Sequence, residues 1–141
     1  MWHHLFLSNK QVQGVFGDAP PDLERAAVCE LLFKTGNPAK VYFSAYVECS
    51  PERFPEAWRA KGFDSVQFRF SAALLIPPRI TGIPVSSAEA SIKFGNGYLS
   101  VNAHDASWSF EGEAILEHVF AEPFENLGPG HDHNWLRPSF R

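Results

Sequence analysis

Histidine and aspartate side chains near the two ends of the chain are the residues most suited to binding a metal. The strongest group is His131, Asp132 and His133, because imidazole and carboxylate groups are ligands of zinc and nickel. Glycine and proline precede this triplet, so a loop without rigid geometry is its expected setting. The adjacent His3 and His4 are expected at the surface rather than as ligands. The sequence therefore predicts no metal site and no cofactor.

Residues able to act in catalysis are equally few. His104 and Asp105 are adjacent, but neighbouring residues on a strand point to opposite faces, so they make a poor pair of base and carboxylate. Cys29 and Ser107 are candidate nucleophiles with no base at a fixed spacing. The sequence contains no nucleophile elbow, phosphate-binding loop, dinucleotide fingerprint, zinc-protease motif or CxxC pair. We therefore expect that the protein is not an enzyme.

Acidic and aromatic residues are interleaved in the C-terminal part of the chain in a pattern that suits protein binding. Residues 101–141 carry seven acidic and two basic side chains, whereas residues 1–100 carry nine acidic and ten basic ones. Acidic groups attract a basic partner and repel the phosphates of nucleic acids, and aromatic rings anchor a partner. Two carboxylates would also suit glycoside hydrolysis, but their spacing does not fix the separation which that reaction requires. The predicted binding surface consists of Tyr98, Asp105, Trp108, Glu111, Glu113, Glu117 and Glu122.

Alternation of apolar and polar residues predicts that β-strands position these groups. The first two strands flank a turn and form an expected hairpin, with Cys29, Leu31 and Phe33 on one face of the first strand. A second hairpin is expected around Asn96-Gly97, because this dipeptide tolerates the backbone angles of tight turns. Residues 72–83 predict a bent, largely buried strand that Pro77-Pro78 interrupts. The predicted strands cover residues 26–33, 40–48, 65–71, 72–76, 79–83, 88–94, 98–103 and 107–111.

Residues 113–121 fit two patterns. As a strand, which we prefer, they place Ala114, Leu116, His118 and Phe120 on one face. As a helix, they place Ile115, His118, Val119 and Glu122 on one side. Residues 123–141 are rich in glycine, proline and polar residues and predict a loop or tail.

One short helix is expected near the N-terminus. Ser8 is its predicted cap, Val12, Val15 and Phe16 follow helical spacing, and Gly17 ends it. A second segment without predicted strands, residues 50–61, contains Pro55 and is expected to be a loop that Trp58 anchors on the core.

Length and composition predict one domain with a core rich in aromatic rings. The chain has 141 residues, 45% of them hydrophobic, and 13 are phenylalanine. Cys29 and Cys49 lie in strand-like segments without the spacing of a metal or redox motif, so reduced thiols are expected. No secretion signal is recognisable, and no apolar run approaches the roughly 20 residues that span a bilayer. We therefore expect a cytoplasmic protein without membrane contacts.

Landmarks in a fixed order give the chain a resemblance to a known family. The landmarks are Trp2, Val15-Phe16-Gly17, Pro20-Pro21, the proline-bearing loop from Pro51 through Pro55 to Trp58, Val66-Gln67-Phe68-Arg69-Phe70, and Ile80-Thr81-Gly82. With these landmarks, residues 2–121 resemble the immunity protein 50 family, which implies a cytoplasmic antidote of a bacterial polymorphic-toxin system. The resemblance implies stoichiometric binding of a cognate toxin domain, without turnover.

We therefore predict a mainly β protein with an antiparallel, strongly curved sheet or a two-layer β arrangement and a short N-terminal helix. An α+β fold is the alternative. The predicted function is neutralisation of a cognate toxin, such as a basic nuclease, by protein binding. A small β-barrel carrier that holds an apolar ligand inside its aromatic core is the second hypothesis.

Overall fold

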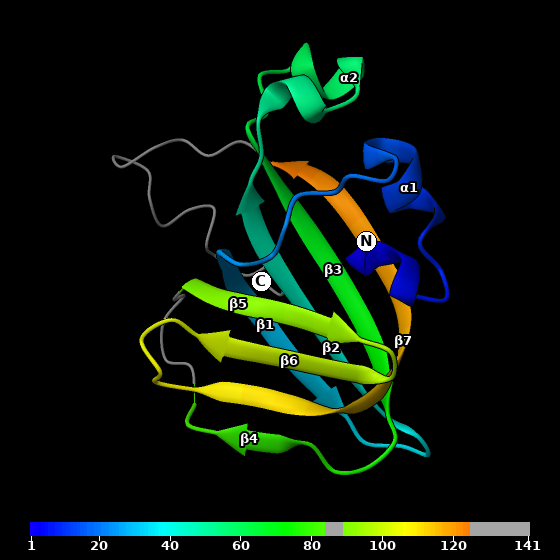
Figure 1. Ribbon diagram of the computed structural model, residues 1–141, viewed down its shortest axis with the longest axis vertical. Coiled ribbons are helices and arrows are strands. Elements are labelled where there is room, and N and C mark those ends of the chain that lie inside the picture. The colour runs from blue at the N-terminus through cyan, green and yellow to red at the C-terminus, as the bar shows by residue number, and fades with distance from the viewer. Residues whose placement is uncertain (84–88, 125–141) are drawn as a thin grey trace.

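The computed structural model describes residues 1–83 and 89–124, and antiparallel β-strands make up roughly half of them (Figure 1). The prediction of a mainly β protein is therefore confirmed. The strands are β1 (Ala26–Lys34), β2 (Ala39–Glu48), β3 (Ser65–Leu74), β4 (Arg79–Thr81), β5 (Glu89–Gly95), β6 (Tyr98–Ala103) and β7 (Ser109–Phe124). The helical elements are the 3-10 helices η1 (Trp2–Leu5) and η2 (Pro51–Arg53) and the α-helices α1 (Lys10–Phe16) and α2 (Glu56–Arg59).

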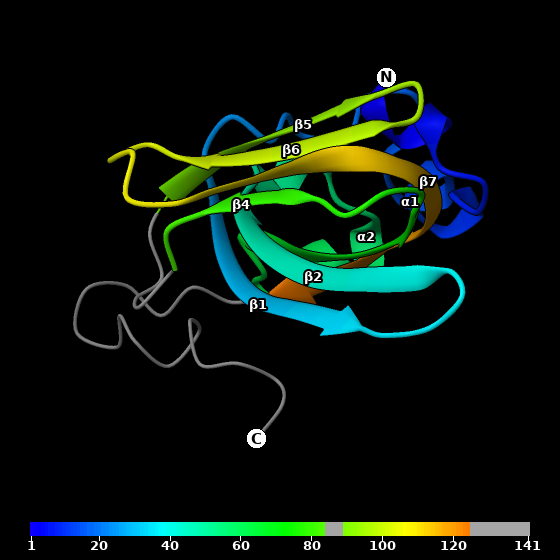
Figure 2. The ribbon, with the colours of Figure 1, turned by 90° about the horizontal axis from the view of Figure 1, so that it is seen from below.

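The strands close into a barrel. Its order is β3-β2-β1-β5-β6-β7, all neighbours are antiparallel, and pairing between β3 and β7 closes the ring (Figure 2). The predicted hairpins β1–β2 and β5–β6 are both present. The strong curvature expected from the sequence therefore extends to full closure, which leaves few open strand edges.

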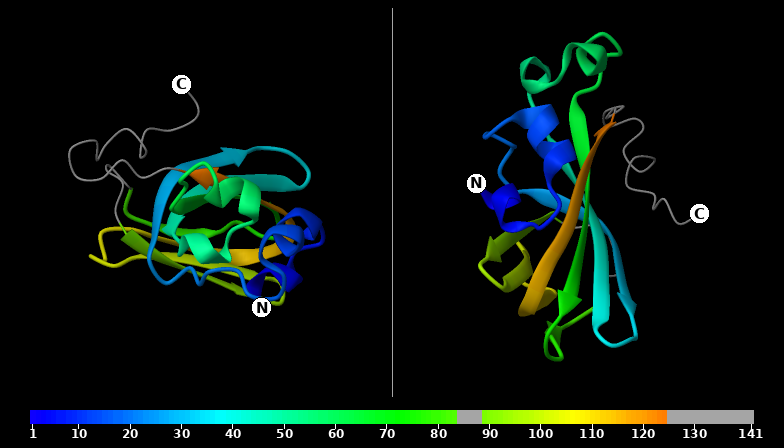
Figure 3. Two further views of the ribbon diagram at one scale, coloured as in Figure 1. Left: turned by 90° about the horizontal axis from the view of Figure 1, so that it is seen from above. Right: turned by 90° about the vertical axis from the view of Figure 1, so that its right-hand side faces the viewer.

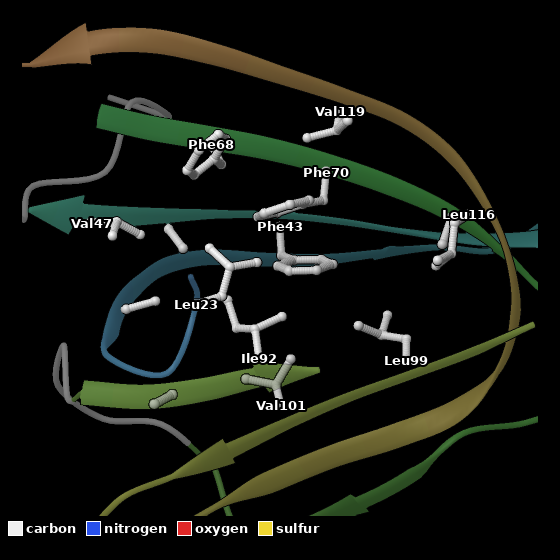
Figure 4. Packing of buried hydrophobic residues seen from close by; sticks show 14 of the residues in the cluster. Leu23, Phe43, Val47, Phe68, Phe70, Ile92, Leu99, Val101, Leu116 and Val119 are labelled. Atoms are coloured by element: carbon white, nitrogen blue, oxygen red, sulfur yellow. The ribbon is translucent and has the colours of Figure 1, made fainter. Parts of the chain in front are cut away.

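Strand β7 makes this closure possible. Its first part pairs with β6 on one edge and with β4 on the other, and from Ala114 onward it pairs with β3. Figure 4 shows β7 bending around the core between these two parts. The preferred strand interpretation of residues 113–121 is confirmed, but residues 107–111 and 113–121 are not two separate strands, because one strand runs from Ser109 through Gly112 to Phe124.

Two β-bulges change which residues face the core. The β1–β2 register shifts between Val28 and Glu30, so Val28 rather than Cys29 shares the inner face with Leu31. In β7 a similar shift follows Leu116, and Val119 is 2% exposed whereas Phe120 is 55% exposed. An extra residue in one strand puts the alternation out of step on its two sides, which is why the predicted face of β1 is wrong at Cys29 and that of β7 is wrong beyond Leu116.

Aromatic rings fill the barrel interior. Phe43 stacks on Phe70 at 4.7 Å between ring centroids, and Phe68 lies 6.0 Å from Phe70 (Figure 4). Phe68 is fully buried, as are Val41 and Leu99 on other strands. Phe70 also lies 5.3 Å from Phe94 of β5 across the barrel, and ring contacts of this kind contribute more than their buried area alone, so they hold opposite sides together.

The N-terminal helices cover one end of the barrel. The Trp2 ring packs edge-on against Phe68 at 5.2 Å, and its indole Nε1 donates a hydrogen bond to the Pro21 carbonyl at 3.0 Å. Figure 3 shows the N-terminal helices lying beside β7. Gly17, with φ of 63°, ends α1 as predicted, but the cap is Asn9. Ser8 instead pairs with His118 of β7.

Three further predictions need correction. Residues 50–61 contain η2 and α2 rather than a plain loop, although Trp58 does pack on Phe54 at 5.4 Å. Strand β4 is exposed along its length because it lies outside the barrel, so the predicted burial of residues 79–83 is wrong. The predicted tail begins too early, since β7 continues to Phe124, and residues 125–141 lie outside the described residues.

None of the helices in the described ranges is long and apolar enough to cross a membrane.

Candidate functional site

Three of the predicted binding residues meet on the outside of the barrel. Tyr98 at the start of β6 lies opposite Glu113 of β7, and its hydroxyl donates a hydrogen bond to Glu111 Oε2 at 2.6 Å. The other oxygen of Glu111 accepts a hydrogen bond from Arg79 Nη1 of β4 at 3.0 Å. We call Arg79, Tyr98, Glu111 and Glu113 the Tyr98 patch. Three strands therefore hold one exposed ring and two carboxylates in a fixed arrangement.

The chemistry of the Tyr98 patch follows from these contacts. The hydrogen bond to Glu111 raises the pKa of Tyr98, because ionisation of the phenol would break it and place two negative charges together. Tyr98 stays 40% exposed, so its ring can contact a partner. Exposed aliphatic side chains border the patch: Leu75 is 55% exposed and Ile115 is 44% exposed. The result is a mixed surface of the kind that binds proteins.

Two other predicted acids lie further along β7 and are paired within the chain. Glu117 forms an ion pair with Lys40 of β2 at 3.2 Å, and Glu122 forms one with Arg69 of β3 at 3.6 Å. Lys40 and Arg69 both belong to the first hundred residues, far in sequence from the acids that they pair with. The described structure therefore has no continuous unpaired row of acids along β7, and Glu113 is the predicted acid of β7 that has no ion pair among the described residues.

The last two predicted residues have structural roles. Trp108 is 4% exposed and belongs to the core, so its expected place on the surface is wrong. It lies next to the turn between β6 and β7, where an aromatic ring fills the barrel interior. Asp105 shapes that turn by accepting hydrogen bonds from the Ser107 amide at 3.0 Å and the Ser107 hydroxyl at 2.6 Å. These bonds stabilise the carboxylate and lower the pKa of Asp105.

His104, the candidate base, also has a local partner. Its Nε2 lies 2.7 Å from the Glu24 carbonyl oxygen, and its Nδ1 lies 3.6 Å from Glu89 Oε2. The imidazole therefore links the β6–β7 turn to the segment before β1. Neither contact involves a nucleophile, so we assign His104 a structural role.

A polar pocket of about 670 Å³ lies where β1, β3 and β5 begin and β2 ends. Arg25 and Glu89, which both line it, form an ion pair at 3.0 Å, and Arg53, also in the lining, donates a hydrogen bond to the Ala19 carbonyl. Four acidic and two basic residues line it, so its lining carries a net negative charge. The lining residues are Pro21, Asp22, Glu24, Arg25, Ala27, Tyr46, Val47, Glu48, Cys49, Ser50, Arg53, Ser65 and Glu89. They come from separate segments without a common motif, so no sequence signal could have found this pocket.

Comparison with known proteins found no match. No family model, curated protein or solved structure matches the chain. The functional argument therefore depends on the geometry described above.

Proposed function

We propose that this protein is an immunity protein that neutralises a toxin domain by stoichiometric binding in the cytoplasm. The observation that carries the proposal is the Tyr98 patch, where one exposed ring is oriented before any partner arrives. Tyrosine side chains at interface centres contribute much of the binding energy, and a fixed ring loses little conformational entropy on binding. Glu113 adds an exposed negative charge beside it, which suits a basic partner.

The size of such an interface requires more than the Tyr98 patch. A stable complex buries on the order of 800 Å² on each partner. This is about a tenth of the 8066 Å² accessible surface of the chain. The exposed Leu75, which follows β3, donates its backbone amide to the Glu113 carbonyl, and the exposed Ile115 lies two residues beyond Glu113 on β7, so both extend the patch with apolar surface. We therefore place the centre of the interface on Tyr98 and its margin on these aliphatic residues.

The filled interior favours binding at the surface over the carrier hypothesis. The rings of Phe43, Phe68 and Phe70 contact one another at the centre of the barrel, and Leu99 is fully buried across from them. A barrel of six strands encloses less space than the eight-stranded barrels that hold one small ligand. An apolar ligand would have to displace these rings.

Co-expression with the polypeptide encoded immediately upstream tests the proposal. We expect that polypeptide to stop growth, and this chain to restore growth and to co-purify with it at a fixed ratio. The double substitution Glu111→Lys and Glu113→Lys should weaken the complex by about a hundredfold, since two attractive contacts become repulsive. The double substitution Glu52→Lys and Glu56→Lys, in η2 and α2, is the matched control, because it changes the charge by the same amount at the far end of the molecule (Figure 1).

The polar pocket gives the competing outcome. If Glu24→Lys and Glu48→Lys abolish rescue while the Tyr98 patch variants retain it, the interface lies at the pocket and the assignment to Tyr98 is wrong. If the unaltered chain neither restores growth nor forms a complex, the immunity function itself is wrong.

A further inference from the structure

Two adjacent histidines and an aspartate meet at the N-terminal end of the barrel. His3, His4 and Asp18 place ligating atoms within 4.8 Å of one another. His4 Nε2 lies 3.4 Å from Asp18 Oδ1, and the two imidazole rings lie 4.2 Å apart. Fifteen positions separate His3 from Asp18 in sequence, so only the fold brings the carboxylate to the histidine pair.

Gln13 connects the three side chains. Its Oε1 lies 2.7 Å from His3 Nε2 and 3.3 Å from His4 Nε2, and its Nε2 donates a hydrogen bond to Asp18 Oδ1 at 3.1 Å. The amide oxygen is thus a fourth potential ligand. In a tetrahedral zinc site with bonds of about 2.0–2.1 Å, the ligand atoms lie about 3.3 Å apart. The separations around His4 Nε2 already match this value.

The cluster differs from a chance surface group because one of its members is buried. His3 is fully buried, and its ring contacts the edge of Trp2 at 5.9 Å. Its Nδ1 has no hydrogen-bond partner among the described residues, so packing rather than a second hydrogen bond holds the ring. His4 and Asp18 are exposed, which leaves the cluster accessible to an ion from solvent.

The elements that carry the four side chains are fixed to the barrel. The side-chain amide of Asn9 donates a hydrogen bond to the His3 carbonyl at 2.9 Å, which ties η1 to the start of α1. Gln11 of α1 makes two hydrogen bonds of 2.7 Å with the backbone of Ala121 in β7. A metal site on supported elements loses little entropy when it orders its ligands.

We propose that His3, His4 and Asp18 form a binding site for a zinc ion, with Gln13 Oε1 or a water molecule as the fourth ligand. Two neutral imidazoles and one carboxylate are a ligand set that suits zinc. The bound ion joins η1 to the residue after Gly17 and so fastens the N-terminal helices over the end of the barrel. Its role is structural and is independent of the proposed toxin binding.

The test uses the full-length chain without an affinity tag and with His131→Gln and His133→Gln, since the C-terminal histidines are also potential zinc ligands. Isothermal titration with zinc chloride should show one ion per chain. His4→Gln and Asp18→Asn should each weaken binding by about tenfold or more. Both residues are exposed, so neither substitution removes core packing, and circular dichroism verifies the fold. His118→Gln, which alters a histidine of β7, is the control and should leave binding unchanged.

A second measurement distinguishes this site from adventitious surface binding. Saturating zinc should raise the melting temperature of the parent chain and not that of His4→Gln or Asp18→Asn, because an ion that binds the folded state stabilises it. Anomalous diffraction at the zinc edge should locate the ion between the named ligands. The proposal is wrong if the parent binds no zinc, if both variants bind as tightly as the parent, or if binding occurs only with His131 and His133 present.

Discussion

Tyr46 has the largest pKa shift among the described side chains. It lies on β2 and is only 7% exposed, and this burial is the main cause that raises its pKa to about 12. The charged groups of Cys29 and Glu30 act in the same direction. A tyrosine that keeps its proton in the folded state makes folding depend on pH in the alkaline range.

We predict that Tyr46→Phe reduces the loss of stability at high pH. Tyrosine in the unfolded chain ionises near pH 10, whereas folded Tyr46 keeps its proton up to about pH 12. Between these values the unfolded state binds fewer protons, so the free energy of unfolding falls as the pH rises. Below this window the contribution is fully present. Urea unfolding at several pH values should show the wild type losing stability relative to Tyr46→Phe, with Tyr42→Phe as a control for removal of a hydroxyl from β2.

Cys49 should react slowly with alkylating reagents in the folded protein. It is 6% exposed, and burial raises the pKa of its thiol, so both access and the thiolate fraction are low. Cys29→Ser leaves Cys49 as the only thiol of the chain. Iodoacetamide labelling of that variant, followed by mass spectrometry, should be at least about tenfold slower without guanidinium than with it. Equal rates would show that the thiol is accessible in the folded state.

At the scale of the elements, two glycines are expected to respond oppositely to alanine. Gly82 follows β4 with φ of 73°, and a Cβ there would collide with the Ser107 carbonyl oxygen. Gly14 lies inside α1, where a Cβ would meet nothing within 4 Å. Gly82→Ala should lower the free energy of unfolding by about 2 kcal/mol or more, and Gly14→Ala should raise it by about 0.5–1 kcal/mol. Urea unfolding measures both, and a stable Gly82→Ala would show that β4 moves freely.

Sequence patterns predicted the strands well because each strand is a local feature. Alternation and turn residues are read within ten positions, and both hairpins follow from them. The bulges at Cys29 and Glu117 were not predictable, since their positions depend on the register of pairing with neighbouring strands. At Glu117 the N-terminal segment also contributes, because the amides of Leu7 and Ser8 donate hydrogen bonds to the carbonyls of residues 116 and 117.

At the scale of the whole molecule, the N-terminal helices stabilise the barrel that they cover. Trp2 contacts the rings of Phe68, Phe70 and Phe94, which belong to opposite sides of the barrel. We predict that Trp2→Ala lowers the free energy of unfolding by about 3 kcal/mol. Far-ultraviolet and near-ultraviolet circular dichroism should report one shared transition at lower urea concentration. Leu7→Ala is the control, because Leu7 is 78% exposed. Unfolding of the helices alone would contradict this prediction.

The charge distribution on the folded molecule differs from the one along the sequence. The acidic excess after residue 100 predicted acidic groups that attract a basic partner. Folding instead places Lys40, Arg69 and Arg79 beside Glu117, Glu122 and Glu111. A count along the sequence cannot show this, because ion pairs depend on which strands become neighbours.

The sequence by itself determined the antiparallel β class, both hairpins and the end of the N-terminal helix, because local periodicity and backbone preferences encode them. Only the tertiary structure decided that the sheet closes, that Trp108 is buried and that Tyr98 meets Glu111. It also decided that His3, expected at the surface, is buried beside His4 and Asp18. The physical reason is the same in each case: these features depend on contacts between distant segments, and a single sequence does not specify which segments meet.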